Sequence, residues 1–253
     1  MRADERKRRI LARARADGRV DVAEIAVELQ VAQETVRRDL RALDEHGLVR
    51  RTHGGAFPVE SAGYETGLKF RTHSMVPEKR RIARAAAERL GDAETVFIDE
   101  GHTPQLVAES LPTGRPLTVV TASLPTAAAL SEVPSTTVLL LGGRVRGLTL
   151  AAVDHWAIRM LADMVIDLAY LGANGISREQ GLTTPDPAVG AVKAQALASA
   201  RRRIFVGVHS RFGVSSFHRF ARVADLEAIV TDSALPAGEA HRYSLLGPKV
   251  FRV

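Results

Sequence analysis

Residues 31–51 read VAQETVRRDLRALDEHGLVRR, and THGGA follows at residues 52–56. Val36, Leu40 and Leu43 recur at positions i, i+4 and i+7, so they share one face of a helix and are expected to be buried. The charged residues between them fall on the other faces, where long polar side chains reach outward. The stretch therefore predicts an amphipathic helix with a basic outer surface.

Gly47 is expected to end this helix, and residues 48–55 predict a short hairpin. A shorter apolar-periodic segment precedes a tight turn at 30–33 and would pack against the longer helix through Val22, Ile25, Ala26 and Leu29. A helix, a tight turn, a basic helix and a basic hairpin together describe a winged helix-turn-helix. In that motif the second helix enters the major groove of DNA.

Arginines dominate the outward side of this predicted motif. Arg37 and Arg38 can each donate two hydrogen bonds to a guanine edge or clamp a phosphate, and the sequence leaves both uses open. A solvated helix face carries similar charges, but the hairpin and the arginine-rich segment 6–15 favour a double-stranded DNA operator as partner. The predicted DNA-binding residues are Gln33, Glu34, Thr35, Arg37, Arg38, Arg41, Arg50, Arg51 and His53.

The segment from ERKRRI at residue 5 to HGGA at residue 56 resembles the DNA-binding domain of DeoR-type bacterial transcriptional regulators, including its TVRRDL core. Ala32 departs from the family pattern, in which a serine usually caps the recognition helix. Because an alanine cap costs about 0.5–2 kcal/mol relative to serine, this helix is expected to begin at Gln33 or to fray slightly.

The composition is that of a folded protein. The 253 residues can form one small domain and one of ordinary size, and 45% hydrophobic with 25% charged residues excludes a disordered chain. A net charge of +6 weakly favours a polyanionic partner. The absence of cysteine excludes disulfides, thiolate catalysis and cysteine-bound zinc, and the scattered histidines predict no metal site. No cofactor is expected.

No apolar run approaches the ~20 residues that a membrane-spanning helix needs, and no apolar segment follows the basic residues at 6–9, so neither a membrane partner nor a secretory signal is expected. We expect a cytoplasmic protein. The predicted organisation is a winged helix-turn-helix at 1–57, a linker at 58–76 and an effector-sensing and oligomerisation domain at 77–253. Pro77 is expected to open a helix over 77–90 whose arginines are solvated above an alanine-lined contact.

From residue 94 onward, short apolar segments alternate with helical ones. The apolar segments lie at 95–99, 117–121, 137–141, 168–172 and 204–208, and two later ones at 228–232 and 250–253 are expected at the sheet edge. Helical stretches are expected near 104–111, 124–132, 153–163 and 188–202. Near-continuous β-branched runs are typical of strands buried on both faces, so the fold class is α/β, with an open, mostly parallel sheet covered by helices.

Small and polar residues follow each of the first five predicted strands. Ligands bind beyond the carboxyl ends of parallel strands, so these loops predict a pocket for a small, hydroxyl-rich anion. Thr103 is expected to cap a helix with Pro104 in its first position, which would aim free amides at a phosphate, although a plain helix cap explains the pair as well.

This half of the chain resembles the DeoR-type effector domain, which shares its fold with ribose-5-phosphate isomerase, through EKRRIA, DEGHT, TASL, LLGG, LGANGI, GLTT and HSRFG. The resemblance implies a phosphorylated sugar as effector. Val208, Arg211 and His102 replace the aspartate, lysine and Ser or Thr of the family pattern. The predicted effector-binding residues are Asp99, Gly101, His102, Thr103, Thr121, Ser123, Gly143, Arg144, Asn174, Lys193 and Arg211.

Three functions are compatible with this pattern. An isomerase needs a base that moves a proton between two carbons, but Asn174 and Val192 stand where related isomerases carry acidic residues, which leaves only Asp99 and Glu100. A DNA-binding protein whose second domain only oligomerises is another alternative. We favour a regulator, most simply a repressor of a carbohydrate-utilisation operon. It is expected to be a dimer or tetramer, with helices at 78–90 and 188–200 as available surfaces.

Overall fold

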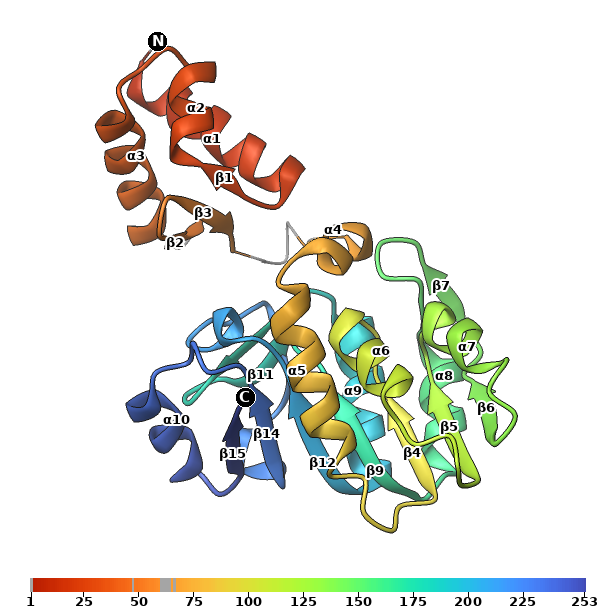
Figure 1. Ribbon diagram of the computed structural model, residues 1–253. Coiled ribbons are helices and arrows are strands. Elements are labelled where there is room, and N and C mark those ends of the chain that lie inside the picture. The colour runs from red at the N-terminus through yellow and green to blue at the C-terminus, as the bar shows by residue number, and fades with distance from the viewer. Residues whose placement is uncertain (1, 47, 60–64, 66) are drawn as a thin grey trace. The chain divides into compact units, whose positions relative to one another are not determined.

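The computed structural model describes residues 2–46, 48–59, 65 and 67–253 (Figure 1). The chain divides into two compact units, Met1–Thr66 and Gly67–Val253. Gly47, which was predicted to end the recognition helix, lies outside the described residues, as does most of the segment 60–66 of the predicted linker. In the described part of the chain, no helix has both the length and the apolar character needed to cross a membrane.

The first unit is a winged helix-turn-helix, as the sequence predicted. Its elements are α1 (Ala3–Asp17), β1 (Val20–Asp21), α2 (Val22–Glu28), α3 (Gln33–Glu45), β2 (Val49–Thr52) and β3 (Gly55–Pro58). The predicted apolar positions form its core, in which Val36, Leu40 and Leu43 of α3 are buried with Ile10 of α1. Ala32 makes no side-chain cap, and α3 begins at Gln33, as expected.

The wing depends on a close approach of two backbones. β2 and β3 pair antiparallel across a turn at His53 and Gly54, and β3 also pairs with β1. A Cβ atom on Gly55 would lie 2.1 Å from the carbonyl oxygen of Val20, so only glycine allows this pairing. Gly54 has φ +87°, a conformation that also favours glycine.

The second unit begins inside the predicted linker. Residues 68–73 form helix α4 (Leu68–His73), which the sequence analysis missed. Its amide at Leu68 donates to the carbonyl of Leu148, so a contact distant in sequence fixes this short helix. Helix α5 (Val76–Ala87) follows with Pro77 in its first turn, exposed arginines on one side and buried alanines on the other, as expected.

A seven-stranded parallel sheet is the centre of the second unit. Its order is β15-β14-β12-β9-β4-β5-β6, and β14 and β15 form one edge, as predicted. The strands are β4 (Thr95–Ile98), β5 (Leu117–Thr121), β6 (Thr136–Leu140), β9 (Ile166–Leu171), β12 (Ala200–Val206), β14 (Ala228–Thr231) and β15 (Lys249–Arg252). Because consecutive residues of each strand face opposite sides, both sides of the sheet must be covered.

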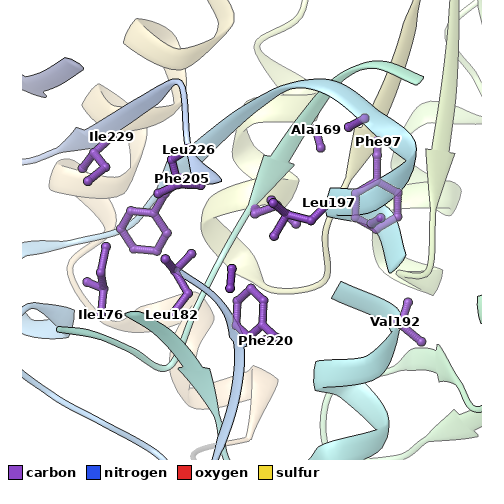
Figure 2. Packing of buried hydrophobic residues seen from close by; sticks show 14 of the residues in the cluster. Phe97, Ala169, Ile176, Leu182, Val192, Leu197, Phe205, Phe220, Leu226 and Ile229 are labelled. Carbon is purple, nitrogen blue, oxygen red and sulfur yellow. The ribbon is translucent and has the colours of Figure 1, made fainter. Parts of the chain in front are cut away.

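Helices cover both faces of this sheet (Figure 1). Val96 and Ile98 pack in one apolar cluster with α5, α6 (His102–Glu109) and α7 (Leu124–Leu130). Phe97 belongs to the opposite cluster, which includes α8 (His155–Ala162), α9 (Pro187–Ser199) and α10 (Ala237–Ser244). Figure 2 shows this second cluster, with Phe205 between Ile176 and Leu226. The helices proposed as oligomer surfaces, α5 and α9, therefore bury their apolar faces in the core.

Two smaller sheets were not predicted. β7 (Arg144–Arg146) pairs with β8 (Ala151–Val153), and β10 (Gly175–Ser177), β11 (Gly181–Thr184) and β13 (His218–Ala221) form a three-stranded antiparallel sheet. The predicted helix at 188–202 is too long, because residues 200–202 already belong to β12. There Arg202 pairs with Leu168 of β9, and this long-range pairing outweighs the good helix propensity of arginine.

Candidate DNA-binding surface and effector pocket

The outward side of α3 carries the predicted DNA-contacting residues. Gln33, Glu34, Arg37, Arg38 and Arg41 are all exposed, and Thr35 is half-buried. The Arg37 guanidinium lies 3.3 Å from the Glu34 carboxylate and 3.4 Å from the Gln33 amide oxygen, so it is already engaged within the helix. Arg38 and Arg41 have no ion-pair partner among the described residues. Both cations are therefore available to an external anion.

The wing presents a second set of cations. Arg50, Arg51 and His53 are exposed on β2 and the following turn, as predicted. The arginines of α1 are arranged differently, because Arg6 points inward to Asp39, and Arg9 and Arg13 pair with carboxylates near them on the same helix. Unlike these three arginines, Arg38 and Arg41 of α3 are exposed without an ion-pair partner in the described part of the chain. That the nine predicted residues contact DNA stays a prediction.

In the second unit, a hollow of about 480 Å³, counting the part open to solvent, lies at the carboxyl ends of β4, β9 and β12. This is the end of a parallel sheet at which ligands bind. Six of the eleven predicted effector-binding residues line the hollow. They are Gly101, His102, Thr103, Asn174, Lys193 and Arg211.

A buried lysine at the hollow contacts two carboxylates and a backbone carbonyl. Lys193 of α9 is 1% exposed, and its ammonium group donates to the Asp99 carboxylate and lies 3.3 Å from both Glu100 Oε1 and the carbonyl oxygen of Gly172. Asp99 also accepts hydrogen bonds from the Glu100 and Gly172 amides. Asp99 thus contacts Lys193 but does not itself line the hollow.

Burial and the neighbouring charges shift the pKa values of these three groups. Burial raises the pKa of Asp99 to about 6, although Lys193 acts in the opposite direction, so the carboxylate is ionised at neutral pH. Burial opposes ionisation of Glu100 as well, but the charges of Lys193 and Arg71 outweigh it and lower the pKa. Burial likewise opposes the charge on Lys193, and the two carboxylates outweigh it and raise the pKa. The site is therefore charged at pH 7.

Three charged lining residues were missed as site residues. Arg71 of α4 is 8% exposed and its guanidinium lies 3.7 Å from Glu100 Oε2. Lys79 of α5 is also buried, and its ammonium donates to the carbonyl oxygen of Arg71 at 2.6 Å. Glu100 had been considered only as a base in the isomerase alternative. Arg71 lies in the segment that was predicted to be a linker, and nothing in the local sequence indicates that its side chain is buried.

The helix start near the hollow differs from the prediction. α6 begins at His102 with Gly101 as its N-cap, so Thr103 is a helical residue and not the cap. The reason is the backbone of Gly101, whose φ of +110° makes the turn one step earlier. The first amides of α6 still have no intrahelical partner, which leaves a partial positive charge at this end.

His102 is neutral under ordinary conditions. Burial lowers its pKa to about 4, the charge of Lys79 acts in the same direction, and the Arg71 carbonyl opposes them. Its Nδ1 atom is buried without a hydrogen-bond partner. Across the hollow, Arg211 donates to the carbonyl oxygen of Asn174 at 3.2 Å, and Val208 contributes an apolar wall. Four of the side chains that line the hollow are thus cationic, namely Arg71, Lys79, Lys193 and Arg211.

The remaining predicted residues lie elsewhere. Thr121 and Ser123 are buried, where Thr121 donates to the Ile98 carbonyl and Ser123 caps α7. Gly143 and Arg144 line a different hollow beside Trp156 of α8, and Arg144 pairs there with Asp154 at 2.8 Å. The structure therefore does not bring these four residues to the hollow at β4, β9 and β12.

A winged helix-turn-helix followed by an α/β unit with a charged pocket is typical of DNA-binding proteins that carry a separate sensor domain. Comparison with known families agrees with this class. Residues 6–62 match the model of the DeoR-like helix-turn-helix domain, and residues 74–233 match that of the DeoR C-terminal sensor domain. The chain belongs to the DeoR family of transcriptional regulators.

Similar proteins cover nearly the whole chain. The HTH-type transcriptional regulator GlpR of Haloferax volcanii is 35% identical over 97% of this chain and 96% of that protein. The glycerol-3-phosphate regulon repressor of Escherichia coli is 29% identical over 93% of both chains. The crystal structure of ribose 5-phosphate isomerase A from Neisseria gonorrhoeae has a TM-score of 0.40 and 16% identity over 54% of this chain and 53% of that one.

The family membership decides between two of the functions that the sequence left open. The chain is a DNA-binding transcriptional regulator and not an enzyme, because the relatives that match it from end to end are named as regulators of transcription. The sugar-phosphate isomerase is therefore not favoured.

Proposed function

We propose that this regulator is a repressor of a carbohydrate-utilisation operon and that a phosphorylated sugar or polyol, bound in the hollow at β4, β9 and β12, controls its affinity for DNA. The charge of the hollow carries the proposal. Among the described residues, the lining of the hollow includes four cations, Arg71, Lys79, Lys193 and Arg211, and one carboxylate, that of Glu100. A phosphate monoester carries about −1.5 to −2 charges at pH 7.

The geometry of the hollow supports the same ligand class. Gly101, His102 and Thr103 at the N-terminus of α6 line the hollow, and such helix ends bind phosphates. Arg211 and Asn174 offer polar groups on the opposite wall. One relative is named as the repressor of a glycerol-3-phosphate regulon, which is a phosphorylated polyol system.

DNA binding is proposed to depend on α3 and the wing, with Arg38, Arg41, Arg50 and Arg51 as the main cations. A ligand that binds one arrangement of the DNA-binding units better than another shifts the population between them. If the favoured spacing mismatches the operator half-sites, the affinity for DNA falls. We further propose that the protein is a homo-oligomer, a dimer or tetramer, because one DNA-binding unit reads few base pairs. We also propose that it acts in the cytoplasm.

A thermal-shift screen tests the ligand class. Phosphorylated sugars and polyols, including glycerol 3-phosphate, glucose 6-phosphate and fructose 1-phosphate, are compared with their unphosphorylated counterparts. We expect only phosphorylated compounds to raise the melting temperature. Arg211→Ala removes a charge-assisted contact, so the affinity for the active compound should fall about ten- to hundred-fold while operator binding without it is unchanged. Equal stabilisation by unphosphorylated compounds would contradict the proposal.

A further inference from the structure

Helix α4 is the first element of the second unit, so it is the element nearest in sequence to the DNA-binding unit. It is short, and its six residues cannot form a stable helix alone. Its docking depends on contacts with the rest of the unit, namely packing on α6 and the hydrogen bond from the Leu68 amide to the Leu148 carbonyl.

Arg71 adds two contacts on the side of the hollow. Its guanidinium lies 3.7 Å from Glu100 Oε2 inside the hollow, and its carbonyl oxygen accepts a hydrogen bond from Lys79 Nζ at 2.6 Å. One residue of α4 is therefore held by a carboxylate that follows β4 and by an ammonium group of α5. Both Arg71 and Lys79 line the hollow.

The carboxylate that faces Arg71 is incompletely satisfied. Glu100 is 5% exposed, and its Oε1 lies 3.3 Å from Lys193, but its Oε2 is buried without a hydrogen-bond partner. Buried carboxylate oxygens are normally hydrogen-bonded, so an unsatisfied one beside a hollow indicates that a further group completes the site. A hydroxyl of a phosphorylated sugar or polyol is a donor of the required kind.

We infer that Arg71 is a ligand-binding residue, and that an anionic ligand in the hollow fastens α4 onto the α/β unit by lying between Arg71 and Lys79. This inference rests on the proposed function. An anion shared by cations of α4 and α5 binds the docked arrangement better than the undocked one. By linkage, ligand occupancy then stabilises the docking of α4, and the state of the hollow is passed to the segment that leads to the DNA-binding unit.

Hydrogen–deuterium exchange of the full-length protein tests the inference, with inorganic phosphate as the probe. In the wild type, phosphate is expected to slow exchange of the amides of residues 68–73. Arg71→Met should lower the affinity for phosphate about tenfold or more, and saturating phosphate should no longer slow exchange in α4. The matched control is Arg84→Met, which removes the same charge from an exposed position of α5 and should behave as wild type.

Arg71→Lys keeps the positive charge. It shows whether an effect of Arg71→Met comes from the lost charge or from misfolding. It should recover part of both the affinity and the protection of α4. Faster exchange of α4 with phosphate, or wild-type affinity and protection in Arg71→Met, would overturn the inference and leave the proposed function intact. If neither phosphate nor any phosphorylated sugar bound the wild type, the proposed function would fail, and this inference with it.

Discussion

The guanidinium of Arg6 in α1 donates two hydrogen bonds to the carboxylate of Asp39 in α3, at 2.5 and 3.2 Å. Asp39 is 3% exposed, although it stands beside two exposed arginines in the recognition helix. The hydrogen bond to Asp39 raises the pKa of Arg6 above its already high value, so the guanidinium stays charged. This ion pair joins α3 to α1 beside the apolar core that the two helices share.

We expect Asp39→Ala to weaken operator binding, although Asp39 is too buried to contact DNA. Loss of a charge-assisted pair that is partly exposed on the arginine side should lower the free energy of unfolding of the first unit by about 1.5–3 kcal/mol. Chemical denaturation and a gel-shift titration measure the two effects. Asp44→Ala, on the same helix, is the control, and equal losses in both variants would argue against a specific role for the Arg6–Asp39 pair.

Arg38→Ala should reduce operator affinity without destabilising the fold, because Arg38 is exposed and has no ion-pair partner in the described part of the chain. If Arg38 contacts a phosphate, the slope of log affinity against log salt should decrease by about 1, and all sequences should be bound more weakly. If it reads a base, discrimination at one position should fall by about 1–3 kcal/mol. Arg81→Ala in α5 is the control. Unchanged affinity would exclude Arg38 from the interface.

Gly55→Ala should disrupt the wing, because the new Cβ would lie 2.1 Å from the Val20 carbonyl oxygen. We expect loss of operator binding with little change in the melting of the second unit. The matched control is Gly54→Asn, at a position with φ +87° where the nearest atom to a Cβ is 3.9 Å away. Normal operator binding by Gly55→Ala, measured by fluorescence anisotropy, would show that the wing is dispensable.

Lys193→Met should strongly destabilise the second unit. It leaves the Asp99 and Glu100 carboxylates buried together without their shared cation, a change that costs about 3–5 kcal/mol for a fully buried pair. Urea unfolding monitored by circular dichroism gives the difference, and exposed Lys249→Met serves as the reference. A loss of less than about 1 kcal/mol would mean that the carboxylates are protonated or reached by water.

The pair between His209 and Asp232 makes stability depend on pH. Its hydrogen bond, 2.7 Å long, raises the pKa of His209 above 6.5. Stabilisation by this pair is therefore complete below about pH 6.5 and is lost as the pH rises through the folded-state value. We expect His209→Gln to be less stable than wild type near pH 6 and to approach it near pH 9. Urea denaturation at both pH values measures the free energy of unfolding. The control variant, His241→Gln at an exposed position, should have the same free energy of unfolding as the wild type at each pH.

Sequence alone determined the parts of this protein whose signals are local. The spacing of Val36, Leu40 and Leu43 defines a helix face whatever the rest of the chain does, and the glycines at 54 and 55 define the turn of the wing. Apolar runs such as that of β4 likewise identify strands buried on both faces. These periodicities predicted both the winged helix-turn-helix and the parallel sheet.

The tertiary structure decided which polar residues meet. Lys193 and Asp99 are 94 positions apart, and only the sheet order brings their strands and helices together. Thr121 ends β5 and Ser123 caps α7, and both are buried away from the hollow, while Arg71, from a segment without periodicity, lines it. The energy that selects these contacts comes from burial and charge pairing between distant segments, so no local pattern records it.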